Sequence, residues 1–173
     1  AAVGLALLFG AANALLVAGS EEQKAQYLPQ IAAGTTGTLA YTGSSGRWDA
    51  AAVDVVCEAA GEGYRIDGTY RYVPDGHTAQ LLVIAARAAG STGENGISLF
   101  VIPADAAGLS RQWLPTMVQT RRQAQLVLDN VFVPDGATCI LTGTRTNGSI
   151  VVGTGSSLQA TRVSVNGNIQ AEG

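Results

Sequence analysis

Residues 39–49 read LAYTGSSGRWD, and this stretch decides how the rest of the chain is interpreted. A short run of strand-forming residues gives way to a loop of small and polar residues, which is followed by Arg47, Trp48 and Asp49. Gly43 and Gly46 carry no Cβ, so a ligand or another segment can approach the backbone closely. The pattern is typical of a binding loop on a β scaffold. Polar loops of this composition also serve simply to turn the chain, and that interpretation stays open.

The bulk composition indicates a folded chain of about one domain, with or without an appendage. Of the 173 residues, 47% are apolar and only 13% are charged, so a packed core is available. The net charge of -3 provides no basic surface for DNA or RNA. We therefore expect no nucleic-acid partner.

The cysteines and the histidine do not form a pattern for metal binding or nucleophilic catalysis. Cys57 and Cys139 lack CxxC spacing, and His77 is the single histidine of the sequence. A zinc site needs more ligands than these residues supply, and no Cys-His or Ser-His-Asp set is evident. We expect two buried thiols and no metal site.

The first nineteen residues carry no charge, and their number is close to that of a membrane span. The run is rich in Ala and Gly, contains Asn13, and has no Lys or Arg before it, as a signal sequence would require. We expect a buried helix in a cytoplasmic protein and favour no membrane span. A membrane or signal segment is the alternative.

Two helices are expected at the start of the chain. The first covers residues 1–18 and stops at Gly19. Ser20 and Gln23 have the spacing of a capping box that begins the second helix. Pro29 is expected to limit that helix or to begin a new turn, and Gly34 to end the helix.

From residue 35 onward the hydrophobic period changes to two, which indicates strands. An Asp67-Gly68 pair predicts a two-residue hairpin turn, and the apolar run 80–87 predicts a strand buried on both faces. The expected fold class is mainly β: an antiparallel β-barrel or sandwich preceded by two helices, with a β-solenoid-like C-terminal tail. The expected strands cover residues 35–41, 53–58, 64–66, 69–73, 80–87, 96–102, 109–114, 125–128 and 131–133.

The tail contains a repeat. NGSIVV at 147–152 and NGNIQA at 166–171 lie nineteen residues apart, which is typical of one coil of a parallel β-helix. Two copies cannot bury a solenoid core by themselves, since about three are needed. A pair of ordinary hairpins is the alternative.

Six sequence motifs follow one another along residues 19–134. They are GSEEQKAQYLP at 19–29, YTGSSGRWD at 41–49, GYRIDGT at 63–69, YVPDG at 72–76, ISLFVIP at 97–103, and TRR at 120–122 with VFVP at 131–134. Through them, residues 1–137 resemble the acyl-CoA dehydrogenase family. The resemblance implies a remnant of the family's N-terminal helical domain at 1–34 and its middle β-barrel at 35–137. Residues 138–173 are expected to form a β-repeat tail.

The resemblance also implies a chemistry. The family oxidises the Cα–Cβ bond of acyl-CoA thioesters and passes a hydride to FAD, so FAD is the implied cofactor, acyl-CoA the implied substrate and a homo-oligomer the expected assembly. The implied site residues are Tyr41, Thr42, Gly43, Tyr72, Val73 and Pro74 for the flavin and Trp48 for the substrate.

The chain departs from the family at positions that matter for this chemistry. Gly43 and Ser44 stand where the family has Glu and Pro, and Pro74 replaces a hydroxyl residue. The family's catalytic carboxylate lies on a C-terminal helical bundle, so we nominate no catalytic residue here. We expect a truncated or fused acyl-CoA dehydrogenase with little or no activity as this chain alone. The rival functions are a weak acyl-CoA or flavin binding module, and a structural protein that assembles through the tail.

Overall fold

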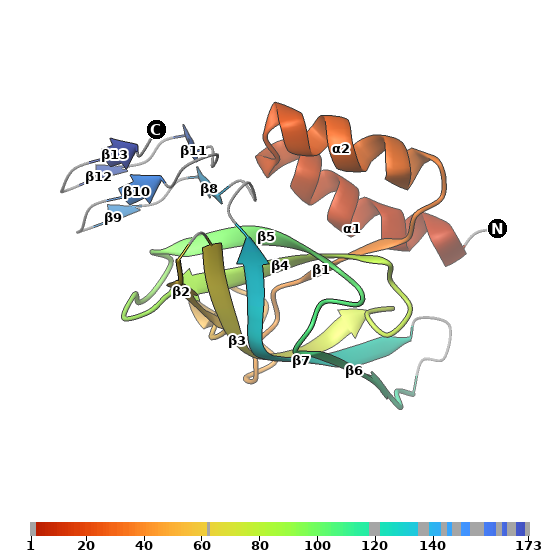
Figure 1. Ribbon diagram of the computed structural model, residues 1–173. Helices are drawn as coiled ribbons and strands as arrows, with labels where there is room; N and C mark the ends of the chain where they lie inside the picture. Colours follow the sequence, from red (N-terminus) through yellow and green to blue (C-terminus); the bar gives the residue numbers. More distant parts are fainter. Residues whose placement is uncertain are drawn as a thin grey trace.

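The chain begins with two helices, α1 (Val3–Ala18) and α2 (Glu21–Ala32), which lie together on one side of a curled sheet (Figure 1). The predicted capping box is confirmed, because Gln23 N donates to Ser20 Oγ at 3.1 Å and Ser20 N donates to Gln23 Oε1 at 3.3 Å. This computed structural model describes residues 3–61, 63–117 and 122–134, with side chains from residue 10, and the backbone of six strands between residues 139 and 171.

Two outcomes are expected at Pro29, and the first of them, that it limits the second helix, is wrong. The helix continues to Ala32, and the N–H of Ala33 bonds to the carbonyl of Pro29 at 2.9 Å. A proline removes one helical hydrogen bond, but Ile31 in the next turn is buried in the core between the helices and the sheet. That burial favours continuing the helix. Neither described helix is long and apolar enough to cross a membrane.

The main sheet has seven strands in the order β1-β4-β2-β3-β7-β6, with β5 paired to the other edge of β4. It curls into a half-barrel (Figure 1), so the expected mainly β class with two preceding helices is confirmed. A short 3₁₀ helix, Ala50–Ala52, precedes β2. The strands are β1 (Gly37–Ala40), β2 (Val56–Ala59), β3 (Gly63–Pro74), β4 (Leu81–Ala88), β5 (Ile97–Pro103), β6 (Leu109–Leu114) and β7 (Gln123–Pro134).

The sheet is mixed, whereas the sequence pattern predicts antiparallel strands throughout. β4 pairs in parallel with β1 and with β2, and the remaining pairs are antiparallel. A period of two reports which face of a strand is buried and carries no information on the direction of its partner. The direction therefore could not be obtained from the pattern.

β4 is buried on both faces, as its apolar run predicts. Leu81 and Val83 pack toward the helices, while Leu82, Ile84 and Ala86 pack into the half-barrel. The alternation follows from the pleat, which sends successive side chains to opposite faces. Two cores thus share β4, and the helices pack on this strand together with Leu39 of β1 and Leu99 and Val101 of β5.

The predicted hairpin at Asp67-Gly68 is wrong, because β3 runs straight through it. Gly68 has φ 141° and lies at a register shift between Ile66 and Gly68 in the pairing with β7. A Cβ added there would lie 2.9 Å from Val55 Cγ2, so a close packing contact also requires glycine. The pair forms an irregularity within one strand. The two strands expected within 125–133 are likewise one strand, β7, with Asn130 at φ 55°.

The tail strands pair in parallel as β8–β11, β9–β12 and β10–β13. In every pair the partners are nineteen residues apart, as in Cys139↔Leu158, Arg145↔Ser164 and Ile150↔Ile169. The two Asn-Gly pairs of the repeat lie outside the described residues, and the β-solenoid stays a prediction. The strands are β8 (Cys139–Thr142), β9 (Arg145–Thr146), β10 (Ile150–Val152), β11 (Leu158–Thr161), β12 (Ser164–Val165) and β13 (Ile169–Ala171).

Candidate functional site

A hollow of about 140 Å³ lies where β1 runs into the loop at 41–49, beside the end of β3. Six of the seven site residues implied by the sequence line it, and Gly43 lies next to them in the loop. The structure therefore brings together two segments that are thirty residues apart in the chain. The lining residues are Gly10, Thr38, Leu39, Tyr41, Thr42, Trp48, Tyr72, Val73 and Pro74.

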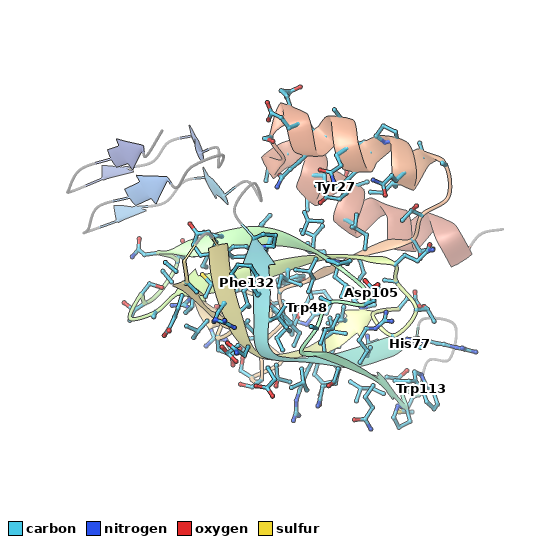
Figure 2. The ribbon with its side chains drawn as sticks, in the orientation of Figure 1. Tyr27, Trp48, His77, Asp105, Trp113 and Phe132 are labelled. Atoms are coloured by element: carbon cyan, nitrogen blue, oxygen red, sulfur yellow. The ribbon has the colours of Figure 1, made fainter. Side chains whose placement is uncertain are left out.

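Aromatic side chains form the open part of this hollow. Tyr41 and Trp48 meet edge to face, with ring centroids 6.1 Å apart and an interplanar angle of 88°. Trp48 is 71% exposed and Tyr72 is 43% exposed. Exposed aromatic faces of this kind offer a surface for stacking a planar ring. Figure 2 labels Trp48 over the body of the sheet, whereas Trp113 projects outward at a distant end of the molecule.

A β-bulge places Tyr72 at the hollow. The register between β3 and β7 shifts between Tyr70 and Val73, and Tyr72 has φ 59°. Tyr70 and Val73 both point into the core, although they are three residues apart, because the extra residue reverses the alternation. Tyr72 is consequently turned outward, toward the loop. A positive φ is rare for a bulky residue and stores backbone strain at this position.

Hydrogen bonds hold the loop against the end of β3. The amide of Arg71 donates to the carbonyl of Thr42 at 2.9 Å. The hydroxyl of Thr38 donates to the carbonyl of Pro74 at 2.7 Å. Together these two bonds join β1 and the loop to the end of β3 at the hollow.

The two charged side chains of the loop pair with each other, and a carboxylate from outside the loop accepts hydrogen bonds from it. Arg47 Nε lies 2.9 Å from Asp49 Oδ2, and Asp54 accepts hydrogen bonds from the amide and the hydroxyl of Ser44. An exposed ion pair such as Arg47–Asp49 contributes little to stability. No lining residue of the hollow is charged, so the described part of the site can stack and pack but cannot move a proton with a carboxylate.

The size of the hollow limits what it can hold. Sites for small molecules and cofactors usually enclose about 300–1,000 Å³, and this hollow of about 140 Å³ is well below that range. The aromatic surfaces fit a flat ring such as a flavin. Pro74 offers neither a hydroxyl nor an N–H at its position. The residues present thus fit one wall of a flavin site.

Sequence reasoning missed four residues that shape this region. Thr38 and Leu39 on β1 and Gly10 on α1 line the hollow, and Asp54 binds the loop. Gly10 could have been recognised from the sequence, since glycine within a helix often marks a close approach of another segment. A Cβ there would lie 3.4 Å from Leu39 Cβ. The other three gave none, because their roles depend on contacts between distant segments.

Groups elsewhere in the described chain do not extend the site. Cys57 is buried in the core, as expected, and the side chain of Cys139 lies outside the described residues. His77 also lies apart from the hollow, pointing away from the sheet (Figure 2). Within the described ranges, no three His, Cys, Asp or Glu side chains gather to hold a metal ion. Burial raises the pKa of Tyr70 well above its ordinary value, and its hydroxyl donates to the carbonyl of Ala85 at 2.8 Å.

Comparison with known proteins agrees with this geometry. Residues 38–131 match the family described as "Acyl-CoA dehydrogenase, middle domain". The acyl-CoA dehydrogenase AFT10-1 of Alternaria alternata is 36% identical over 118 residues, which cover 67% of this chain and 27% of that protein.

Solved structures of such proteins have the same fold. The glutaryl-CoA complex of glutaryl-coenzyme A dehydrogenase matches with a TM-score of 0.70 and 27% identity, over 76% of this chain and 34% of that one. Glutaryl-CoA dehydrogenase from Mycobacterium smegmatis, in complex with FADH2, matches with a TM-score of 0.63 and 25% identity, over 72% of this chain and 32% of that one. The chain therefore spans about a third of the length of these proteins.

Proposed function

Because the chain belongs to the acyl-CoA dehydrogenase family, we propose that the hollow is the wall that this β domain contributes to an FAD site. One observation carries the proposal: the loop at 41–49 and the bulge at Tyr72 meet at a single hollow with exposed aromatic faces. When bound, FAD supplies the redox chemistry, and the protein binds and orients it. Tyr41, Thr42, Gly43, Tyr72, Val73 and Pro74 hold the flavin on this proposal, and Trp48 lies beside the substrate.

The proposed substrate is an acyl-CoA thioester, on which the complete enzyme performs α,β-dehydrogenation. Abstraction of a proton requires a positioned base, and the described lining of the hollow contains no carboxylate. The chain spans about a third of the length of its solved relatives. We therefore propose weak flavin binding without turnover for this chain alone.

Flavin binding can be tested on the purified 173-residue chain. FAD is added, and both the melting temperature and the visible flavin spectrum are recorded. A ligand that binds the folded state raises the melting temperature as its concentration passes Kd. We expect such a rise, its loss in Tyr72→Ala, and its retention in Trp113→Ala, which removes an exposed aromatic outside the hollow. An unchanged melting temperature and spectrum at high FAD concentration would contradict the proposal.

A second candidate function is assembly through the tail. The observation that favours it is the constant spacing of nineteen residues in all three parallel pairs, since strands stacked in this way present edges that can pair with further strands. Light scattering over a range of concentrations tests it, with a chain ending at Pro134 as the control. Assembly of the full chain alone supports a homo-oligomer formed by the tail, and equal sizes for both contradict it. The expected cytoplasmic location stays a prediction, which cell fractionation tests.

A further inference from the structure

The turn at Gly43–Gly46 lies between two side chains that come from other parts of the chain. The amide of Gly46 donates to the carbonyl of Gly43 at 3.1 Å, which closes the turn. A Cβ added at Gly46 would lie 3.2 Å from Tyr72 Cε2, so the turn rests against the ring of Tyr72. On the other side, Asp54 Oδ2 accepts from the amide of Ser44 at 3.0 Å and also from its hydroxyl.

Asp54 also occupies the space that a side chain at position 43 would need. A Cβ built on Gly43 would lie 1.9 Å from Asp54 Oδ1 and 2.6 Å from its Cγ. Gly43 and Asp54 are therefore mutually dependent: glycine at 43 makes room for the carboxylate of 54. Asp54, eleven residues further along the chain, thus places a carboxylate beside position 43.

The backbone on both sides of Asp54 is fixed to the buried strand β4. The amide of Arg87 donates to the carbonyl of Val55 at 2.8 Å, and its guanidinium Nε donates to the carbonyl of Val53. The same guanidinium donates to the carbonyls of Ser91 at 2.9 Å and Gly93 at 2.8 Å. Val53, Val55 and Arg87 are all buried. Asp54 thus reaches the loop from a backbone segment that is hydrogen-bonded to β4 on both sides.

We propose that Asp54 is the positioning residue of the candidate site: its carboxylate holds the Gly43–Gly46 turn against Tyr72 and so fixes the aromatic wall of the hollow. The claim that this wall faces a flavin rests on the proposed function. The role of Asp54 in ordering the wall does not depend on the flavin, so the order of the turn and the binding of FAD are measured separately.

Hydrogen exchange of the Gly46 amide measures the order of the turn, because this amide bonds within the turn and not to Asp54. Local opening sets the exchange rate of such amides. In Asp54→Ala we expect Gly46 to exchange about tenfold faster, since two bonds to a charged acceptor are lost. Asp54→Asn keeps an acceptor oxygen for the Ser44 amide and should stay close to the original rate. Asp67→Ala is the matched control, because Asp67 Oδ1 also accepts a backbone N–H, from Asn130 at 2.6 Å, outside this loop.

A double-mutant cycle tests whether position 43 and Asp54 act through one contact. Gly43→Ala displaces the carboxylate and should speed exchange at Gly46 as Asp54→Ala does, and the double variant should be no worse than either single variant. FAD titration of the same proteins should show an affinity lowered about fivefold in both single variants and unchanged in Asp67→Ala. Unchanged exchange at Gly46 in Asp54→Ala, or additive effects in the double variant, would overturn the positioning role. If FAD does not bind the unaltered chain, the proposed function fails while the exchange result still decides the role of Asp54.

Discussion

The neighbouring strands β3 and β7 each contain a bulge with a residue at positive φ, but the two residue types differ. β3 is bulged at Tyr72 and β7 at Asn130, and both residues have left-handed backbones with φ 59° and 55°. Asparagine tolerates this conformation well, whereas a bulky aromatic residue does not. The amide of Asn130 also donates to Asp67, and Tyr72 instead lies 43% exposed at the hollow. Strain is thus kept at the candidate site and avoided at Asn130, as expected if the exposed ring at 72 has a function.

Deleting Asn130 should have the largest effect. Without the extra residue, the buried side chains of Val131 and Val133 would move to the outer face. Each buried valine contributes about 1.5–3 kcal/mol, so the sum of about 3–6 kcal/mol reaches the lower end of the stability of a small domain, about 5–15 kcal/mol. We expect the variant to be unfolded by circular dichroism. A folded protein with an unchanged melting temperature would show that this bulge does not set the alternation of β7.

Exchanging the residue at the structural bulge tests the strain directly. Asn130→Tyr should lower the free energy of unfolding by about 1–2 kcal/mol, because an ordinary residue is forced into the left-handed region. Urea denaturation measures the change, with Asn130→Gly as the control, for which we expect little loss. Equal stability of the two variants would mean that the left-handed backbone at 130 is not strained for tyrosine.

Tyr70 points into the core and Tyr72 points outward at the bulge, so a substitution at Tyr70 tests the core face of β3. Tyr70→Phe should cost about 1 kcal/mol at neutral pH, because the hydrogen bond to the carbonyl of Ala85 is lost. Burial, and then the charges of Cys57 and Asp54, raise the pKa of Tyr70 in the folded state. The contribution to stability is therefore full below the ordinary tyrosine value of about 10 and falls as the pH rises above it. Denaturation as a function of pH should show this alkaline loss reduced in Tyr70→Phe, and identical profiles would contradict the assignment.

The smallest effect on stability is expected at the strained bulge itself. In Tyr72→Asn the relief of backbone strain offsets the lost contacts of the ring, so the stability should change by less than about 1 kcal/mol. FAD affinity should nevertheless fall about tenfold, since base–aromatic and similar stacking contacts contribute about 1–3 kcal/mol. Calorimetric titration separates the two quantities. A large loss of stability with unchanged FAD affinity would contradict a binding role for the bulge at Tyr72.

The elements that depend on local chemistry could be predicted from the sequence. The capping box at Ser20, the two-sided burial of β4 and the strand bounds of β6 all follow from short-range patterns. The positions of the candidate site residues followed from the resemblance, and the structure gathers six of the seven at one hollow.

The features that the sequence did not predict share a physical cause. Strand direction, the passage of the helix through Pro29 and the bond between Asp54 and Ser44 depend on which distant segments pack together, and no local pattern encodes that. The bulges did leave a trace in the sequence, because the buried pairs Tyr70 and Val73, and Leu128 and Val131, are three residues apart where a regular strand requires two or four.

The chain carries two tryptophans, and their indole N–H signals test the central claim in one experiment. Trp48 lines the hollow, and Trp113 is exposed outside it. When FAD is titrated into the ¹⁵N-labelled protein, the indole signal of Trp48 should shift in a saturable manner while that of Trp113 stays in place. A shift of Trp113 alone, or of neither signal, would contradict a flavin site at this hollow.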